Sequence, residues 1–172
     1  MKKLPEMAPR IAAALKGVTE ALDAAGIDYA LIGGLAVGVY GHERATKDID
    51  LLISRQDIKK FAGEFVASDI DVIQGKHAGV RIDYIFPAKH EDFLDDSVPG
   101  GTNADGVAVV APAPLIYMKL VAGRLRDQDD VIRLLRAGKI DLDKVRAYLE
   151  KHAPQLIDDF DSYATEAKLG DS

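Results

Sequence analysis

Two aspartates separated by one residue, Asp48 and Asp50, form the pattern of clearest chemical meaning in this sequence. Residues 48–53 are predicted to form an apolar strand, and a strand directs residues i and i+2 to the same face, about 7 Å apart along the chain. Two like charges on one face are unfavourable unless a metal cation or a basic group compensates them. Carboxylate oxygens are the ligands that Mg²⁺ and Mn²⁺ prefer. The pair therefore predicts a divalent-metal site.

A third carboxylate, Asp83, lies inside another apolar stretch, residues 80–86. A charged group in such a strand is expected to be paired or coordinated. Three carboxylates on adjacent strands would suit a two-metal mechanism, in which cations about 4 Å apart activate a hydroxyl and stabilise the leaving pyrophosphate. The alternative is a surface ion pair with Arg81, which shares the same strand face.

The Asp-x-Asp spacing alone carries little information, because four other pairs have it and such pairs are usually solvated turns or helix caps. These pairs are Asp69/Asp71, Asp127/Asp129, Asp141/Asp143 and Asp159/Asp161. Only the first pair continues into an apolar strand and follows a strand, two glycines and a helix. Its context therefore sets it apart.

The two glycines, Gly33 and Gly34, follow a predicted buried strand and precede a short helix. Glycine lets the backbone approach a phosphate closely, and the N-terminus of a helix directs N–H groups at an anion. An ordinary strand-to-helix turn is the alternative interpretation. A glycine turn close to an acidic pair favours phosphate binding.

The elements that must position these residues alternate between helices and short strands. Helices are predicted at residues 8–25, 35–40, 56–67, 115–125, 129–137, 142–151 and 156–167, and strands at residues 27–32, 48–53, 80–86 and 106–110. Residues 91–103 are rich in acidic, Gly and Pro residues and are expected to be irregular. We expect an α/β (α+β) fold in which residues 1–110 form a small mixed β-sheet core with flanking helices. Residues 111–172 are expected to form a C-terminal helical lobe packed on that core.

Composition narrows the function classes. The 172 residues are 48% hydrophobic and 29% charged, which suits a globular core, and the absence of cysteine excludes disulfides, zinc–thiolate sites and a cysteine nucleophile. The four histidines have no metal-binding spacing. A net charge of −6 argues against a broad nucleic-acid surface, so any such contact must be local. Neither a signal segment nor a membrane span is evident, and we expect a cytoplasmic protein.

The first motif block resembles the signature of the DNA polymerase beta superfamily of nucleotidyltransferases, especially its minimal bacterial branch. It runs from Leu31-Ile32-Gly33-Gly34 through Arg44-Ala45-Thr46-Lys47-Asp48-Ile49-Asp50. The resemblance implies that the glycine turn binds a nucleoside triphosphate (NTP) and that three aspartates bind catalytic metal: Asp48, Asp50 and Asp83. Many active members have serine where this chain has Gly34.

Two further residues of this block, Arg44 and Thr46, are candidates for contact with the phosphates of the NTP. Each has an alternative role. Thr46 would be a cap or strand-entry residue, and Arg44 would be an exposed partner of Glu43 or Asp48.

The second motif block, residues 115–130, is similar to the helical region of abortive-infection type nucleotidyltransferase toxins. Those carry a lysine, then Arg-Asp and a further aspartate. Lys119 and Arg126 are seven residues apart, or two helical turns, so both would face a triphosphate if one helix, or two in line, carries them. A solvated face of charged i,i+4 pairs is the alternative.

The leading hypothesis is a metal-dependent enzyme that transfers a nucleoside monophosphate (NMP) from an NTP to a hydroxyl, with Mg²⁺ or Mn²⁺ as cofactor. The resemblance leaves the acceptor open among tRNA, a partner protein and a small molecule, and a toxin–antitoxin system is the context we expect first. The alternative is a catalytically inactive protein of the same fold that binds a nucleotide or a partner. Base preference and oligomeric state do not follow from the sequence.

Overall fold

A six-stranded mixed sheet forms the centre of the computed structural model, which describes residues 2–62 and 71–170. The strand order is β3-β4-β2-β1-β6-β5. Strand β1 runs antiparallel to β2 and parallel to β6, β2 runs parallel to β4, and the outer pairs β3–β4 and β5–β6 are antiparallel. The strands are β1 (Tyr29–Ile32), β2 (Ile49–Ile53), β3 (Val72–His77), β4 (Val80–Ile85), β5 (Thr102–Ala104) and β6 (Val107–Val109). The predicted mixed α/β fold is confirmed.

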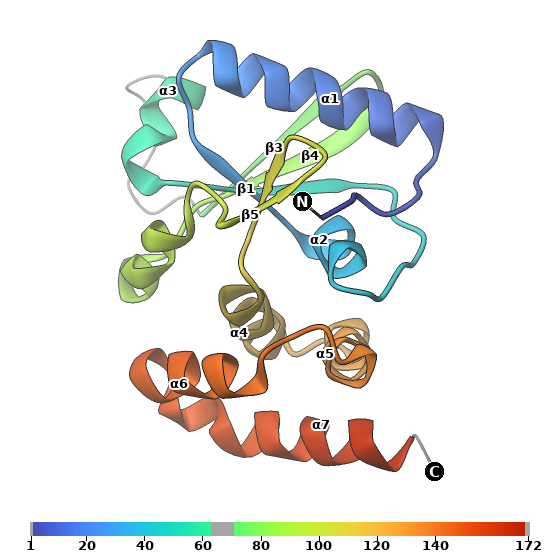
Figure 1. Ribbon diagram of the computed structural model, residues 1–172. Helices are drawn as coiled ribbons and strands as arrows, with labels where there is room; N and C mark the ends of the chain where they lie inside the picture. The colour runs from blue at the N-terminus through green and yellow to red at the C-terminus, as the bar shows by residue number, and fades with distance from the viewer. Residues whose placement is uncertain (1, 63–70, 171–172) are drawn as a thin grey trace.

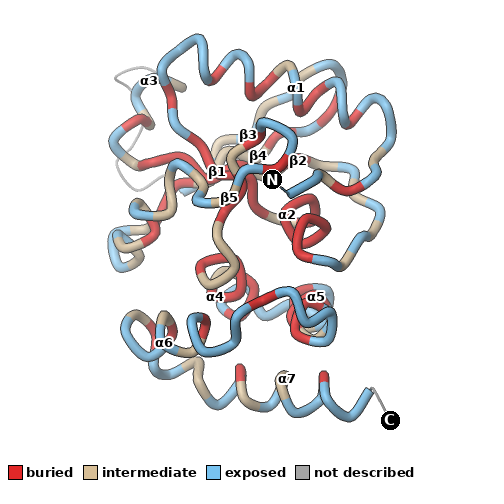
Figure 2. The backbone as a smooth tube through the Cα atoms, viewed as in Figure 1, coloured by how far each residue is buried: buried red, intermediate tan, exposed pale blue. Residues whose placement is uncertain are grey.

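Helices cover both faces of the sheet. In Figure 1, α1 (Pro9–Ala24) crosses one face, while α2 (Gly33–Val39) and α4 (Pro112–Ala122) lie on the other. Three further helices continue the layer beyond α4: α5 (Leu125–Ala137), α6 (Leu142–His152) and α7 (Ile157–Leu169). The buried backbone in Figure 2 follows the central strands and the inner sides of the helices. No helix in the described ranges is both long and apolar enough to span a membrane.

The first helix shows how the sequence pattern creates this packing. Its apolar residues Ile11, Leu15, Val18 and Leu22 recur at spacings of four, three and four, and each is at most 5% exposed. Pro9 begins the helix, where its missing N–H has no hydrogen bond to lose. The predicted helix at residues 8–25 is confirmed to within one residue at each end.

Two strands of the sheet were not predicted, β3 and β5. Each forms an antiparallel hairpin with its successor, and the turns contain Ala78-Gly79 and Asp105-Gly106, all four residues with positive φ. Positive φ at both central residues is typical of tight hairpin turns that match the twist of a sheet. The prediction of irregular structure at residues 91–103 was wrong at both ends, because a 3₁₀ segment (Lys89–Ser97) and β5 occupy much of it.

The predicted helix at residues 56–67 begins as a 3₁₀ turn (Arg55–Asp57) and continues as α3 (Ile58–Ala62). Its remainder lies outside the described residues, as does Asp69. The predicted helix at 115–125 starts earlier, at Pro112, and ends at Gly123, whose φ of 63° is the usual left-handed cap. Helix α5 then begins at Leu125, four residues before the predicted start.

All six strands precede Pro112, and all helices from α4 onward follow them. The two parts are in contact, since α2 packs against α4. The division into a core of residues 1–110 and a lobe of residues 111–172 stays a prediction.

Candidate active site

Asp50 and Asp83 lie opposite each other on neighbouring parallel strands. In the register of β2 and β4, Ile49 pairs with Ile82 and Asp50 pairs with Asp83. Adjacent strands are about 4.8 Å apart, and successive side chains alternate between faces. Because both isoleucines are fully buried on one face, both aspartates point to the other. The alternation of buried and outward-facing residues in the two strands thus brings together two carboxylates that are 33 residues apart in the sequence.

The electrostatics of Asp50 reveal a crowded acidic site. The pKa of Asp50 is raised from 3.8 to about 6. Burial of the carboxylate is the largest cause, followed by the negative charges of Asp83 and Asp48. A hydrogen bond with Asp83 also raises this pKa, and the positive charge of Lys119 lowers it. Asp48 directly precedes β2 and is close enough to contribute. At neutral pH the ionised Asp50 is therefore costly and would be stabilised by a cation.

Gly33 provides the space that the Asp50 side chain occupies. Its φ of 69° lies in the left-handed region, and a Cβ at this position would overlap the Asp50 carboxylate. The turn from β1 into α2 therefore needs glycine here for two independent reasons. The lack of a side chain at Gly33 places the backbone of this turn directly against the acidic site.

Gly34 has a different neighbour, the guanidinium of Arg44. A Cβ at position 34 would lie 3.1 Å from Arg44 Nη1, tighter than most such contacts. Any side chain larger than hydrogen at this position would therefore require the Arg44 guanidinium to shift.

Arg44 itself is held by the helical part of the chain. Its Nε and Nη2 donate to Oδ1 and Oδ2 of Asp130 at 2.9 and 3.0 Å. Asp130 is 1% exposed and also accepts from Lys119 Nζ at 2.9 Å. The partner of Arg44 is thus neither Glu43 nor Asp48. A bidentate pair with a buried carboxylate fixes the arginine firmly.

Lys119 connects this pair to a second carboxylate. Its Nζ lies 3.1 Å from Asp127 Oδ1, and Arg124 Nε lies 2.7 Å from Asp127 Oδ2. Burial alone would raise the pKa values of Asp127 and Asp130, but hydrogen bonds from the neighbouring cations outweigh it and both pKa values are lowered. Lys119, Asp127 and Asp130 are buried, Arg44 is partly buried and Arg124 is exposed. We call these five residues, after their buried centre, the buried ion network: Arg44, Lys119, Arg124, Asp127 and Asp130.

The buried ion network flanks the acidic site. Lys119 lowers the pKa of Asp50, and the negative charge of Asp50 contributes to the raised pKa of Arg124. Cationic groups from α4 and from the α4–α5 connection are therefore within electrostatic reach of Asp50. Such an arrangement can bind a polyanion that bridges the cations and a metal.

Three other residues singled out in the sequence have distinct positions. The Thr46 hydroxyl donates to the Asp48 carbonyl oxygen at 3.1 Å, the strand-entry role given above as its alternative. Arg126 is exposed in the first turn of α5, on a different helix from Lys119. Arg81 Nε donates to Asp83 Oδ1 at 3.0 Å, so the predicted ion pair exists alongside the Asp50–Asp83 pairing.

Sequence reasoning missed Asp130 and Arg124 as parts of this arrangement. Asp127 and Asp130 are three apart on one helix and both are at most 1% exposed. Two acids at i and i+3 share a helix face, and this spacing was the available signal. Arg124 was missed because α5 was expected to start later.

Among the described members of the other Asp-x-Asp pairs, one has the helix-cap role expected of such pairs and others form ion pairs instead. Asp141 caps α6 by accepting from the backbone N–H groups of Asp143 and Lys144. Asp161 pairs with Arg146, and Asp71 pairs with Arg55. None of these roles requires a metal.

The fit of a divalent cation depends on the donor atoms. Within residues 2–62 and 71–170, no three histidine, aspartate or glutamate side chains already surround one metal position. Asp50 and Asp83 nevertheless supply opposed carboxylates, and Asp48 acts on Asp50 electrostatically. An oxygen-only donor set with excess negative charge is the kind that Mg²⁺ and Mn²⁺ prefer. The residues present therefore fit such an ion.

Comparison with known proteins identifies a family for most of the chain. Residues 10–167 match the model of the family described as nucleotidyltransferase of unknown function (DUF6036). A crystal structure of an antigenic nucleotidyltransferase-like protein from Paracoccidioides brasiliensis is similar, with 17% sequence identity and a TM-score of 0.45. That similarity covers 91% of this chain and 94% of the other. The curated proteins include no match to this chain.

Proposed function

Because the chain belongs to this family of nucleotidyltransferases, we propose that it transfers an NMP from an NTP to a hydroxyl acceptor at the Asp48, Asp50 and Asp83 site. The observation that carries the proposal is the in-register pairing of Asp50 with Asp83 beside Gly33. The raised pKa of Asp50 supports it, since the site accumulates negative charge that a divalent cation would balance. A purely structural strand pair would gain nothing from two facing carboxylates.

The proposed metal ligands are Asp48, Asp50 and Asp83. A bound Mg²⁺ or Mn²⁺ would activate the acceptor hydroxyl and stabilise the charge on the leaving pyrophosphate. Thr46 supports Asp48 through its hydrogen bond to the Asp48 carbonyl, and Gly33 leaves room for the Asp50 carboxylate.

The proposed triphosphate site lies between the glycine turn and the buried ion network. Gly33 and Gly34 bring backbone close to the acidic site, and Arg44 covers Gly34. Lys119 contributes positive charge that reaches Asp50. Arg126 is assigned to the outer phosphates only by its exposed position in the first turn of α5.

A test of the site is calorimetry with ATP and Mg²⁺ added to the purified protein. We expect binding that Asp50→Asn abolishes, because the substitution removes a charged metal ligand. The matched control is Asp159→Asn, which alters an exposed acid from another Asp-x-Asp pair on α7 and should leave binding intact. Equal binding by the wild type and Asp50→Asn would leave the enzyme proposal without support.

The alternative is an inactive protein that binds a nucleotide or a partner without chemistry. The presence of all three carboxylates, two of them directly paired, favours the enzyme. The two hypotheses separate in a transfer assay, because the inactive protein would bind ATP without releasing pyrophosphate.

The acceptor and the biological context form the finer part of the proposal. A net charge of −6 suits a cationic small molecule or a protein partner better than a broad RNA surface, although tRNA stays among the candidates. A toxin–antitoxin role predicts that expression of the chain alone arrests growth. Asp50→Asn should then restore growth, and growth arrest that persists in this variant would argue against transfer as the toxic activity.

A further inference from the structure

A surface pocket whose lining includes none of the three aspartates indicates a second site. Its volume is about 230 Å³, and it is lined by Gly41, His42, Arg133, Arg136 and Ala137. It lies where the connection from α2 to β2 meets the C-terminal half of α5, two elements that lie close together in Figure 1. A water molecule in liquid occupies about 30 Å³, so the pocket has room for a small hydrated ion or a phosphate group.

Gly41 makes the close approach of these two segments possible. Its φ is 110°, in the region that favours glycine, and a Cβ there would lie 3.1 Å from both Ala137 Cβ and Lys139 Cδ. The absence of a side chain lets the end of α5 lie against this connection. The same approach brings Lys139 beside the pocket and places His42 on its wall.

The cations of the pocket are only weakly neutralised. Arg133 pairs with Asp129 at 3.0 Å, but both side chains are about half exposed, so the pair is worth little and can exchange for another anion. Arg136 donates to the carbonyl oxygens of Ala167 and Glu166, which carry no full charge. Among residues 2–62 and 71–170, Arg136 has no carboxylate within ion-pair distance.

His42 adds a neutral hydrogen-bonding group. Its Nε2 lies 3.6 Å from Asp130 Oδ1, and Asp130 is already balanced by Arg44 and Lys119. The pocket wall therefore combines two guanidinium groups with an imidazole, and Lys139 lies at its edge.

We propose that this pocket binds a phosphoryl group, at a site separate from the one between Gly33 and Asp50. Guanidinium groups form planar, bidentate hydrogen bonds with phosphate oxygens, and a concave wall lets several donors reach one anion. Two ligands carry such a phosphoryl group, free phosphate and the backbone of a nucleic acid. Because the net charge of the chain is −6, contact with a nucleic acid must be local, and this pocket would provide such a contact.

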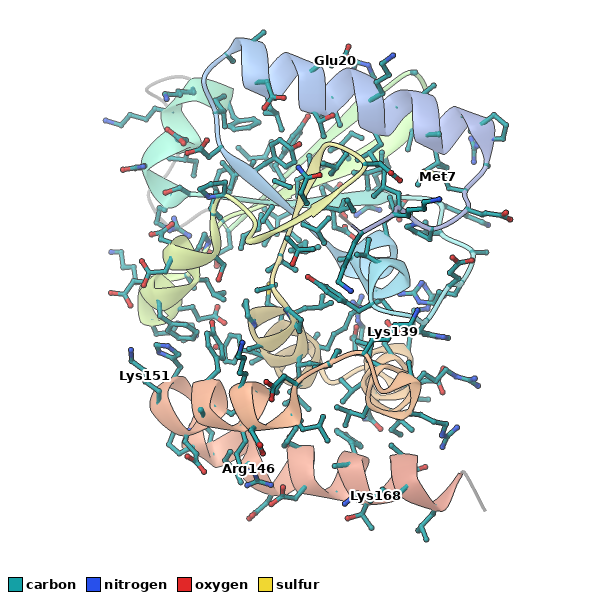
Figure 3. The ribbon with its side chains drawn as sticks, viewed as in Figure 1. Met7, Glu20, Lys139, Arg146, Lys151 and Lys168 are labelled. Atoms are coloured by element: carbon teal, nitrogen blue, oxygen red, sulfur yellow. The ribbon has the colours of Figure 1, made fainter. Side chains whose placement is uncertain are left out.

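The variant that tests the pocket is the double substitution Arg133→Gln with Lys139→Gln, which removes two exposed cations without touching the acidic site. The matched control is Lys16→Gln with Lys151→Gln, which changes the net charge equally on α1 and α6. Lys139 and Lys151 lie on opposite sides of the view in Figure 3. Arg136→Gln is a second pocket variant, with thermal unfolding followed in parallel because Arg136 also binds the end of α7.

Two probes are titrated at low salt, inorganic phosphate by calorimetry and a fluorescein-labelled single-stranded RNA by anisotropy. The proposal expects the wild type to bind at least one of them, and the pocket double variant to bind it on the order of tenfold more weakly. The control should stay within about twofold of the wild type. Pocket-dependent binding of phosphate alone identifies free phosphate as the source, and pocket-dependent binding of RNA identifies the nucleic-acid backbone.

Two results would overturn the proposal: a wild type that binds neither probe, or a pocket variant and a control that lose affinity equally. The same variants are titrated with ATP and Mg²⁺. Because the pocket residues are separate from Asp48, Asp50 and Asp83, this binding should be unchanged. Asp50→Asn should lose ATP binding and keep the binding of phosphate or RNA. This result would show that the pocket binds its ligand independently of the acidic site.

Discussion

Replacing Asp50 by asparagine is expected to make the metal-free protein more stable above about pH 6. The folded protein raises the pKa of Asp50 from 3.8 to about 6, because of burial and then the charges of Asp83 and Asp48. A pKa that is higher in the folded than in the unfolded state means that the folded state holds the proton more tightly. The free energy of unfolding therefore falls as the pH rises from about 4 to 6. A shift of about two pKa units corresponds to a loss of about 3 kcal/mol, complete above that range.

Asparagine keeps the size of the side chain but has no charge to desolvate. Urea unfolding followed by circular dichroism, with a chelator present, measures the difference between the variant and the wild type. At about pH 7.5 we expect Asp50→Asn to be more stable by up to about 3 kcal/mol, and at about pH 5 by roughly half as much. The control Asp159→Asn should change stability by less than about 0.5 kcal/mol.

The pH dependence of this difference is the decisive feature. A gain of the same size at both pH values would come from packing or hydrogen bonding, and not from the charge of Asp50. An asparagine variant that is less stable than the wild type at about pH 7.5 would refute the reasoning outright. Added Mg²⁺ should stabilise the wild type and leave Asp50→Asn unchanged, since ligand binding to the folded state alone raises stability.

Two further substitutions probe the surroundings of the site. Asp130→Asn removes the carboxylate partner of Arg44 and one of the two carboxylate partners of buried Lys119, which keeps Asp127, and should lower the free energy of unfolding by about 3 kcal/mol in urea, whereas exposed Asp129→Asn should cost less than about 1 kcal/mol. Gly33→Ala should abolish the binding of ATP with Mg²⁺ in calorimetry, because its Cβ would displace the Asp50 carboxylate. Gly26→Ala has a similar φ of 68° with nothing within 4 Å, so it should cost about 1–2 kcal/mol of stability and leave that binding intact.

The parts of the fold that could be predicted are those in which the pattern alone decides the structure. Strand β2 is a run of apolar residues, and its register with β4 follows from burying Ile49 and Ile82 on one face. A one-residue shift of β4 against β2 would have put Ile82 on the opposite face of the sheet from Ile49. The pairing of Asp50 with Asp83 is therefore a consequence of the apolar residues beside them.

The missed strands lack such a pattern. Strand β3 has the sequence Val-Ile-Gln-Gly-Lys-His and lies at the edge of the sheet, where none of its residues is buried. Its pairing with β4 depends on tertiary context that local propensity does not capture. For β5 a signal existed, because Asp105-Gly106 is a strong hairpin turn sequence.

The buried ion network could be predicted only in part. Lys119 was a candidate from its motif, but the helix break at Gly123 put Arg124, and not Arg126, beside Asp127. The pairing of Arg44 with Asp130 joins residues 86 positions apart, and no local pattern specifies it. Long-range ion pairs of this kind follow from how the helices pack on the sheet.

The most direct test of the central claim is mass spectrometry of candidate acceptors after incubation with the protein, the four NTPs and Mg²⁺. Candidate acceptors are a tRNA pool, partner proteins and cationic small molecules. The account predicts an acceptor whose mass grows by one NMP, with release of pyrophosphate, in the wild type and Asp159→Asn but not in Asp50→Asn or Asp83→Asn. Transfer that continues at the wild-type rate in Asp50→Asn would contradict it.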